Sequence, residues 1–187
     1  MKTVILKTLS LAFLISLFGS ACTQTNQNTC EESNIEAPEM DIHTAVLYGN
    51  LEAVKQHIEA GTDINSKEPM GGSTPLISAA TFDQREIAKT LIEAGADLAI
   101  KNKDGSTALH SAAFFCRVEI VQMLIDARAD KSIKNNFGAT ARESVMGPFA
   151  EIKPVYEMMQ QQLGPLGLKL DMQEVEDARP VVAMMLQ

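Results

Sequence analysis

Histidine and cysteine are the side chains of this sequence with the widest chemical range, because both bind metal ions and both serve in nucleophilic catalysis. The 187-residue chain contains three of each: His43, His57, His110, Cys22, Cys30 and Cys116. Their spacing forms neither a Cys-x-x-Cys pair nor a His-Glu-x-x-His motif, and the chain also lacks a phosphate-binding glycine loop and a Gly-x-Ser-x-Gly nucleophile turn. We therefore expect a protein that is not an enzyme, with no metal site, no cofactor and no small-molecule substrate.

The elements that would position these side chains follow a fixed period. Asp104-Gly105 predicts a turn, Thr107 can cap the helix after it, and apolar residues recur at helical spacing between residues 118 and 125. The same pattern stands 33 residues upstream, where Thr74, Leu76, Ala79, Ala80, Glu86, Ile92 and Asp97 match Thr107, Leu109, Ala112, Ala113, Glu119, Ile125 and Asp130. A more diverged copy precedes it at a spacing of 34 residues. A period of this size predicts stacked two-helix units, because neither helix of one unit buries its apolar face alone.

These motifs resemble the ankyrin repeat family. The matching residues are Thr74-Pro75-Leu76 and Thr107-Ala108-Leu109-His110 at the helix starts and Glu93-Ala94-Gly95-Ala96-Asp97 at the end of a second helix. The resemblance implies an all-α solenoid of stacked helix-turn-helix units with β-hairpin-like loops. One departure is Arg128, which stands where the other copies have Gly61 and Gly95. Because a left-handed helix end prefers glycine, we expect Arg128 to cost roughly 1 kcal/mol or to shift that turn.

The repeat region spans residues 39–147 in this interpretation, with units at about 40–73, 74–106 and 107–139 and a degenerate unit at 140–163. In the first unit we expect helices near 41–48 and 51–60, capped by Asp41 and Asn50. His57 stands where the later copies have leucine, which predicts a polar flank at the outer end of the stack. Residues 149–163 are expected to form the second helix of the degenerate unit.

Residues 164–187 are expected to form helices that cap the solenoid. Gly164-Pro165 interrupts the pattern, and two short helices are predicted at 170–178 and 180–186, the second opened by Pro180. We expect both to fold back over the last repeat. The alternative is a free amphipathic tail that presents Val182, Met185 and Leu186 to a partner.

The N-terminal segment has the features of an export signal. Residues 1–21 combine a basic start, a short apolar stretch and the small residues Gly19-Ser20-Ala21, which together predict a cleaved signal peptide. Cys22 resembles the acylated cysteine of exported bacterial ankyrin-repeat lipoproteins; the alternative is ordinary cleavage after Ala21. Residues 22–38 would then be the acylated cysteine and a disordered tether. We expect an outer-membrane anchor that faces the periplasm, or otherwise a soluble periplasmic or secreted protein.

The charge of the chain limits its partners. The net charge is −8, and removal of residues 1–21 takes away two lysines and no acidic residue, which leaves −10. A surface this acidic disfavours nucleic acid and anionic lipid headgroups. We therefore expect no nucleic-acid partner, and contact with the membrane only through the lipid anchor.

The repeat spacing also separates the histidines and gives a role to one cysteine. His43 and His110 lie two repeats apart, and packed helices are about 8–10 Å from each other, so the two rings would be about 20 Å apart, whereas zinc binds ligands at about 2 Å. In the ankyrin family the corresponding histidine is structural and bonds the loop at the helix start. Cys116 either occupies a turn, where other copies have Gly49 and Asp83, or pairs with Cys30 in an oxidising compartment.

An aromatic position recurs in three successive repeats. Tyr48, Phe82 and Phe115 occupy it, beside Leu47, Thr81 and Phe114. The resemblance places these residues in the last turn of each first helix, on the concave side where ankyrin proteins usually contact partners. A row of exposed aromatic side chains is typical of a binding surface; the alternative is that the rings pack as core. The loop-tip residues would form its rim: Met70, Lys103, Asp104, Ser106, Asn136 and Phe137.

These observations favour a non-catalytic protein-protein interaction module, tethered in the bacterial envelope, that binds an unidentified protein through its concave face and loop tips. The alternative is a structural spacer or scaffold in an envelope complex, which contacts its partner through the C-terminal segment. The sequence identifies neither partner.

Overall fold

A computed structural model describes residues 37–187, and in this range the chain forms helices and connecting loops without a β-strand. The predicted signal peptide (1–21), the acylated Cys22, Cys30 and most of the predicted tether (22–38) lie outside the described residues. None of the helices described is both long enough and apolar enough to cross a lipid bilayer.

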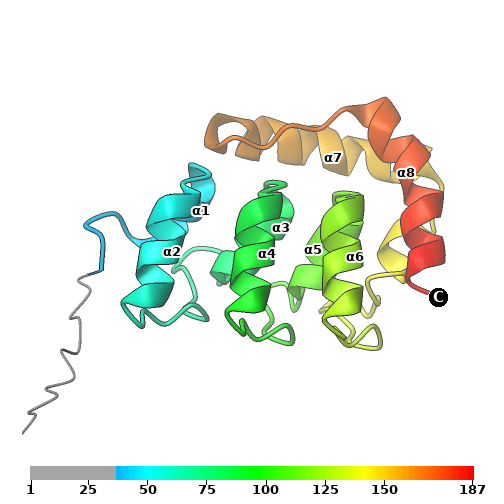
Figure 1. The fold of residues 1–187 in the computed structure, drawn as a ribbon. Coiled ribbons are helices and arrows are strands. Elements are labelled where there is room, and N and C mark those ends of the chain that lie inside the picture. Colours follow the sequence, from blue (N-terminus) through cyan, green and yellow to red (C-terminus); the bar gives the residue numbers. More distant parts are fainter. Residues whose placement is uncertain (1–36) are drawn as a thin grey trace, which may run out of the picture. The chain divides into compact units, whose positions relative to one another are not determined.

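Three helix pairs stand side by side and form the body of the fold (Figure 1). They are α1 (Ile42–Leu47) with α2 (Leu51–Glu59), α3 (Pro75–Thr81) with α4 (Arg85–Glu93), and α5 (Ala108–Phe114) with α6 (Val118–Asp126). In each pair the first helix leads away from a long hairpin loop, a three-residue turn follows, and the second helix returns. The predicted all-α solenoid is confirmed.

The helices begin where the cap residues predict. Asp41 accepts hydrogen bonds from the backbone N–H groups of His43 and Thr44, both at 3.1 Å, and so begins α1. Asn50 accepts one from Ala53 at 3.1 Å and begins α2 in the same way. These bonds satisfy amide groups that the first turn of a helix leaves without an intrahelical partner.

The stack is held together by a continuous apolar core. Leu76, Leu91, Leu109 and Leu124 are at most 1% exposed, and alanines between them allow the helices to approach closely. Removing one of these leucine side chains, as in Leu109→Ala, would leave a cavity and cost about 2–5 kcal/mol of stability.

Arg128 occupies its left-handed position without a shift in the turn. Its φ is 63°, close to 71° at Gly61 and 83° at Gly95. The hydrogen bonds that end the helix are those of the preceding repeat: Arg128 N donates to Ile125 O at 2.9 Å, as Gly95 N donates to Ile92 O at 3.0 Å. Of the two expected outcomes, a cost in backbone strain or a shifted turn, the structure shows the first: Arg128 has the left-handed backbone conformation and the turn is unchanged.

The outer flank of the first repeat differs from the prediction. His57 is only 4% exposed, because the chain that leads into α1 lies over it. Its Nε2 donates to Met40 O at 2.7 Å, and its Nδ1 lies 3.0 Å from Thr62 Oγ1. The expectation that His57 forms an exposed polar flank is wrong; the ring ties two loops together instead.

The degenerate fourth unit is not the predicted helix pair at 140–163. Its first helix is reduced to one 3-10 turn, η1 (Glu143–Val145), and its second helix position is taken by α8 (Met172–Met185), which stacks beside α6 (Figure 1). Helix α7 (Phe149–Leu163) leaves the stack and crosses the ends of the repeat helices. Arg142 and Glu143 stand in place of Leu109 and His110, and the shortened first element packs on α5 and α8.

The C-terminal segment is one helix rather than two. Helix α8 continues through Pro180, although the proline ring removes one backbone hydrogen bond. Burial of Val175 and Val182, on either side of Pro180, stabilises the continuous helix. Val182 and Leu186 are 0% and 3% exposed and join the core of the repeats. The expected folding back over the last repeat is therefore confirmed, and the alternative of a free tail presenting these side chains is wrong.

Candidate functional site

The hairpin loops between repeats are joined into one edge by hydrogen bonds. Lys103 N donates to Gly71 O at 2.8 Å, and Asn136 N donates to Asp104 O at 2.9 Å. Two side chains add further links: Lys103 Nζ donates to Pro69 O at 2.7 Å and to Met70 O at 2.6 Å, and Asn136 Nδ2 donates to Lys103 O at 2.9 Å. Each loop thus holds the next, and we call this row of loops, residues 68–73, 102–106 and 135–139, the loop edge.

Each loop is also held by a side chain of its own. Asn102 Oδ1 accepts the N–H groups of Asp104 and Ser106 at 3.0 and 2.9 Å, and Asn135 does the same in the next loop. Glu68 does this in the first loop, where its carboxylate accepts the N–H groups of Met70, Gly71 and Ser73. Partial burial raises the pKa of Glu68, but these hydrogen bonds outweigh it and hold the pKa below the usual value. Gly105 is required here, because a Cβ at this position would lie 2.7 Å from Asn136 N.

Large apolar side chains project from the two outer loops of this edge. Met70 is 83% exposed and Phe137 is 81% exposed. Lys103, Asp104 and Asn136 are exposed between them, and Ser106 is partly buried below. The structure therefore brings the six predicted loop-tip residues together along one edge.

The predicted aromatic row lies elsewhere. Tyr48, Phe82 and Phe115 directly follow α1, α3 and α5, at the turn into the second helix. Because a helix of seven residues is about 10 Å long, this end of each pair is separated from the loop that precedes it. Figure 1 shows the hairpin loops at the bottom of the stack and α7 across its top. The prediction of one groove formed by the aromatic row and the loop tips is wrong, since the two sets occupy opposite ends of the helices.

Helix α7, the segment after it and the start of α8 pack over most of the aromatic row. Phe115 is only 5% exposed, Phe82 and Phe114 are partly buried, and all three belong to an apolar cluster with α7 and α8. The Tyr156 ring of α7 packs on Phe114 with 4.7 Å between centroids. Phe115 therefore packs as core, which was the alternative interpretation, and is not free to contact a partner. Tyr48 remains 79% exposed; Leu47 and Thr81 are partly buried.

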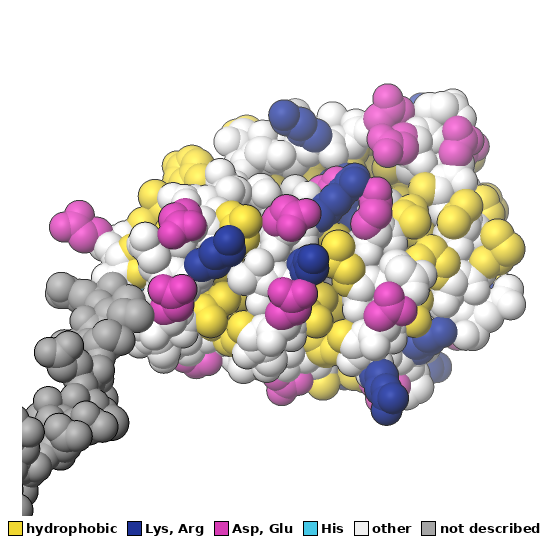
Figure 2. Space-filling model, in the orientation of Figure 1, with side chains coloured by type: hydrophobic (Ala, Val, Ile, Leu, Met, Phe, Trp, Pro, Cys, Tyr) yellow, Lys and Arg dark blue, Asp and Glu magenta, His cyan; other side chains and the backbone are white. Residues whose placement is uncertain are grey.

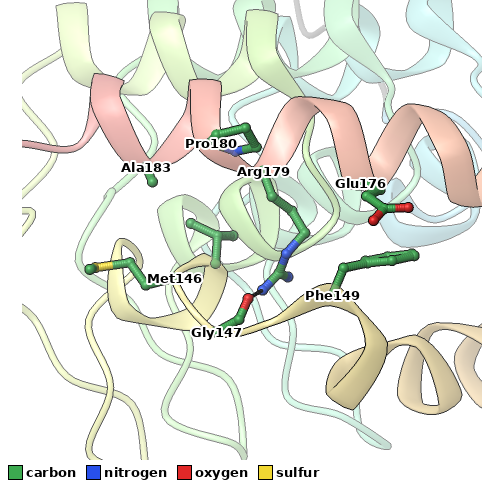
Figure 3. Close-up of a pocket in the computed structure, with 8 residues that line it drawn as sticks. Met146, Gly147, Phe149, Glu176, Arg179, Pro180 and Ala183 are labelled. Atoms are coloured by element: carbon green, nitrogen blue, oxygen red, sulfur yellow. Dashed lines mark hydrogen bonds between the residues drawn. The ribbon is translucent and has the colours of Figure 1, made fainter.

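A buried arginine holds α7 in place. Arg179 of α8 is 4% exposed, and its Nη1 donates to Tyr156 Oη at 2.9 Å. Its Nη2 donates to Gly147 O at 2.9 Å (Figure 3). Tyr156 Oη in turn donates to Phe114 O at 2.6 Å. Within residues 37–187 no carboxylate lies within ion-pair distance of Arg179.

Sequence reasoning missed Arg179, although a signal was present. Val175, Arg179, Val182 and Leu186 follow one another at i, i+4, i+7 and i+11, so they share one face of a helix. An arginine within an otherwise apolar face predicts a buried polar partner, since a buried charge without one is costly. Beside it, Met146, Phe149 and Glu176 line an open cavity of about 390 Å³ (Figure 3).

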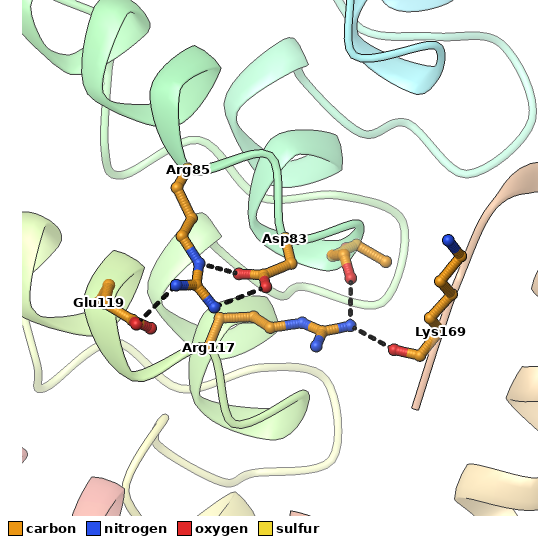
Figure 4. A network of polar contacts seen from close by, with 6 residues as sticks. Asp83, Arg85, Arg117, Glu119 and Lys169 are labelled. Atoms are coloured by element: carbon orange, nitrogen blue, oxygen red, sulfur yellow. Dashed lines mark hydrogen bonds and ion pairs between the residues drawn. The ribbon is translucent and has the colours of Figure 1, made fainter. Parts of the chain in front are cut away.

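Two further arginines connect the turns of the second and third repeats (Figure 4). Arg85 contacts Asp83 at 3.0 Å and Glu119 at 2.6 Å, which links α4 to α6. Arg117 donates through Nη2 to Thr81 O at 3.4 Å and to Lys169 O at 3.1 Å, which links the third repeat to the segment between α7 and α8. Both arrangements join elements of the fold and offer no nucleophile beside a base.

The outward face of α2, α4 and α6 carries both signs of charge. Figure 2 shows acidic and basic side chains interspersed on this face, with hydrophobic side chains between them. Such a mixture is typical of a solvated surface and favours no strongly charged ligand.

The histidines at the first-helix positions serve the fold. His110 Nδ1 lies 2.9 Å from Thr107 Oγ1, and Nε2 lies 3.2 Å from Ala139 O. A carbonyl oxygen only accepts, so Nε2 carries the proton and the ring bridges the helix start to the next loop, as the family resemblance implied. Burial lowers the pKa of His110 and of His43 below the usual value, which favours neutral rings.

The partly buried thiol of Cys116 and the buried phenol of Tyr156 are not activated. Burial raises the pKa of Cys116 to about 11 and the pKa of Tyr156 to about 12. Both groups are therefore protonated near neutral pH, whereas a reactive cysteine requires a lowered pKa. Cys116 occupies the left-handed turn position, with φ of 55° beside 67° at Gly49 and 56° at Asp83. Among residues 37–187 no group of three or more His, Cys, Asp or Glu side chains is arranged to hold a metal ion.

Comparison with known families agrees with this architecture. The sequence pattern of the family described as ankyrin repeats, in three copies, matches residues 42–135. The chain belongs to the ankyrin repeat family. The crystal structure of the ankyrin repeat domain of Bcl-3, a member of the IκB protein family, is similar with a TM-score of 0.54 and 31% sequence identity, over 55% of this chain and 45% of that chain.

Curated ankyrin proteins match a shorter segment. Protein phosphatase 1 regulatory subunit 27 of Homo sapiens is 44% identical over 63 residues, which are 34% of this chain and 40% of the relative. The DNA-binding protein RFXANK of Homo sapiens is 35% identical over 65 residues, which are 35% of this chain and 25% of the relative. The chain thus matches less than half the length of each of these relatives. Ankyrin repeats generally mediate protein-protein interaction, and these relatives are named as regulatory and binding proteins.

Proposed function

We propose that this chain is a non-catalytic protein-interaction module whose main contact surface is the loop edge. The supporting observation is the exposure of Met70 and Phe137, at 83% and 81%, on loops that hydrogen bonds hold in place. Exposed aromatic and methionine side chains surrounded by polar groups are typical of the centre of a protein interface. Charged and amide groups of Lys103, Asp104 and Asn136 stand between them.

The rigidity of the loop edge supports this proposal. Ordering a flexible loop on binding costs affinity, and a preorganised loop avoids part of that cost. The links from Lys103 to the first loop and from Asn136 to the second fix the spacing between Met70 and Phe137 before any partner arrives. A folded partner with two matching apolar pockets would fit this edge better than a disordered peptide.

We further propose that the module works in the bacterial envelope. The basis is the sequence of the first 38 residues: an export signal over 1–21, Cys22 as the acylated residue and a polar tether to residue 38. The chain would be anchored to the outer membrane facing the periplasm, or otherwise be soluble in the periplasm or secreted. Its partner would then be an envelope protein, with no role for nucleic acid.

The test is a crosslinked pull-down from envelope fractions with the native chain and a Met70→Ser, Phe137→Ser variant. We expect the variant to lose a partner that the native chain captures. The control is Met158→Ser, which removes a methionine that is 48% exposed on α7, away from the loop edge. Capture of the same proteins by all three chains, with unchanged helical content, would refute the proposal.

A scaffold function with a C-terminal contact is the second candidate, and one observation supports it. Met184 and Val181 are 61% and 41% exposed on α8, and Met146 is 55% exposed nearby in the chain that follows η1. In this case a Val181→Ser, Met184→Ser variant would lose the partner while the Met70→Ser, Phe137→Ser variant retained it. The same pull-down therefore separates the two candidates.

A further inference from the structure

Helix α7 buries fewer of its side chains than the second helices of the stack do. It has 15 residues, of which Tyr156 alone is buried, whereas each of α2, α4 and α6 has three buried residues among nine. Pro154 inside the helix removes one backbone hydrogen bond. The apolar cluster that contains Tyr156 is separate from the core of the repeats. A segment with few buried side chains is expected to open before the rest of the fold.

Beneath α7 lies a surface with the period of the repeats. We call it the turn-end surface: Tyr48, Phe82, Phe114 and Phe115. Tyr48, Phe82 and Phe115 hold the same position in three successive repeats, so their rings follow a line across the stack. At the second and third positions the rings belong to one apolar cluster with α7 and with Leu168, Leu170 and Val175, whereas Tyr48 remains 79% exposed. Lifting α7 would remove one cover of this cluster and enlarge the exposed aromatic surface beyond Tyr48 of the first repeat.

We propose that the turn-end surface is a helix-binding site, which α7 fills within the chain and which an amphipathic helix of a partner protein takes over when α7 lifts. The partner's chemistry is indicated by α7 itself. Ile152, Tyr156, Met159 and Leu163 follow at i, i+4, i+7 and i+11 on the face that packs on the cluster. A competing helix would carry apolar side chains at this spacing. One of them would be a hydroxylated aromatic that reaches Phe114 O and Arg179.

The connections of α7 allow it to lift while the stack remains folded. Glycine stands on both sides, at Gly147 and at Gly167, and a Cβ at either position would meet no atom within 4 Å. The next element, α8, is held independently, because Val182 and Leu186 belong to the core of the repeats. Opening would break the Tyr156 hydrogen bonds and the apolar contacts of α7, while the helix pairs keep theirs.

This site is distinct from the loop edge, and the first measurement uses the unmodified full chain. In native-state hydrogen exchange we expect the amides of residues 149–163 to exchange at least 100-fold faster than those of α3 to α6, through an opening that precedes global unfolding. If α7 exchanged only together with α5 and α6, α7 would be an integral part of the fold and the proposal would be overturned.

The second measurement supplies α7 in trans. The probe is a fluorescent synthetic peptide of residues 149–163, titrated into the full native chain and into an Ile152→Ser, Tyr156→Ser variant. Because the native chain's own α7 competes, we expect the variant to bind the probe at least tenfold more tightly. A Met158→Ser chain, altered on the exposed face of α7, should behave as the native chain does. A probe that carries the same two serine substitutions should not bind.

The outcomes are separable from those of the proposed function. Equal affinity of the native chain and the variant for the probe, or no binding to a variant whose repeats remain protected from exchange, would overturn the helix-binding site. If the variant did not fold, the exchange result on the native chain would decide alone. A Met70→Ser, Phe137→Ser chain should bind the probe as the native chain does, so failure of the loop edge leaves this test unaffected.

Discussion

Replacing Tyr156 with phenylalanine removes a single oxygen from the interior and leaves the ring in place. That oxygen donates to Phe114 O at 2.6 Å and accepts from Arg179 Nη1 at 2.9 Å. Tyr156 is fully buried and Arg179 is 4% exposed, so water does not readily replace either bond. The ring contacts to Phe114 and Phe149, with centroids at 4.7 and 6.1 Å, stay unchanged. The substitution therefore isolates the polar part of the attachment of α7.

The expected magnitude follows from the two bonds. A buried hydrogen bond contributes about 0.5–1.5 kcal/mol and one to a charged group about 1.5–3 kcal/mol, and the groups left without a partner remain buried. We expect Tyr156→Phe to lower the free energy of α7 opening by about 2–4 kcal/mol. Because about 1.4 kcal/mol corresponds to a factor of ten, α7 would open roughly 30 to 1,000 times more often.

The assay combines hydrogen exchange with urea unfolding. Exchange of residues 149–163 reports the local opening, and far-UV circular dichroism reports the global transition. A double-mutant cycle with Arg179→Met measures the coupling of the two side chains, which we expect to be about 1–3 kcal/mol. Leu109→Ala is the control, because it should destabilise the stack without increasing the difference in exchange rate between the amides of α7 and those of the repeats.

Two results would refute this reasoning. A loss below about 0.5 kcal/mol in Tyr156→Phe would mean that the hydrogen bonds are replaced by solvent and that α7 is held by its apolar contacts. Strict additivity of Tyr156→Phe and Arg179→Met would mean that Arg179 acts through Gly147 alone.

Three other predictions follow from single residues. Acidification from pH 7.5 to 5.5 should lower the melting temperature, because the unfolded chain protonates His110 near its usual pKa of 6.5 while burial holds the folded pKa below that value. His110→Gln should flatten this dependence on pH. An unchanged slope in the variant would contradict the lowered pKa of His110 in the folded chain. Arg128→Gly should raise the free energy of unfolding in urea by about 0.5–1 kcal/mol, because φ is 63° at this position. Gly95→Arg, at the equivalent position with φ of 83°, should lower the free energy of unfolding. Changes of the opposite sign in the two variants would contradict backbone strain as the cause. With the other two cysteines replaced by serine, Cys116 should react with iodoacetamide at pH 8 about 100-fold more slowly in the folded chain than in urea. The reason is that burial raises the pKa of Cys116 from 9.0 to about 11. Equal rates would show that the turn of the third repeat leaves this thiol accessible in the folded chain.

The repeats could be predicted from the sequence because their signals are local and recur. Thr74 and Thr107 mark helix starts, and Leu76 and Leu109 recur at the same place in each unit, so a pattern weak in one copy is reinforced in the next. The loop-tip residues could be grouped for the same reason, since a fixed period places equivalent residues in line, although the sequence predicted them as the rim of the aromatic row. Arg128 retained the expected turn because hydrogen bonds of the helix end determine that geometry.

The helix at Phe149–Leu163 was predicted, but its place outside the stack and its contacts could not be predicted in this way. The spacing of Ile152, Tyr156 and Met159 shows that one face of the helix is apolar, but any apolar surface within reach would satisfy it. Arg179 is similar: its position in an apolar face indicates a buried polar partner without indicating which one. The aromatic row and the loop tips were wrongly placed on one surface because both recur with the period of the repeats. The length of the first helix, which separates the aromatic position from the loop before that helix, was not taken into account.

Local chemistry in the chain was therefore sufficient for the family, the helix pairs and the caps, because turn residues, cap residues and helical spacing act within a few positions. The accessible surface was decided by tertiary structure. Tyr48 and Phe115 occupy equivalent positions, yet one is 79% exposed and the other 5%, because α7 passes over the third repeat and leaves the first uncovered. Burial depends on elements distant in sequence. The hydrophobic effect that packs α7 onto the stack is non-directional, so the residues that α7 covers do not indicate in their own sequence which element will cover them.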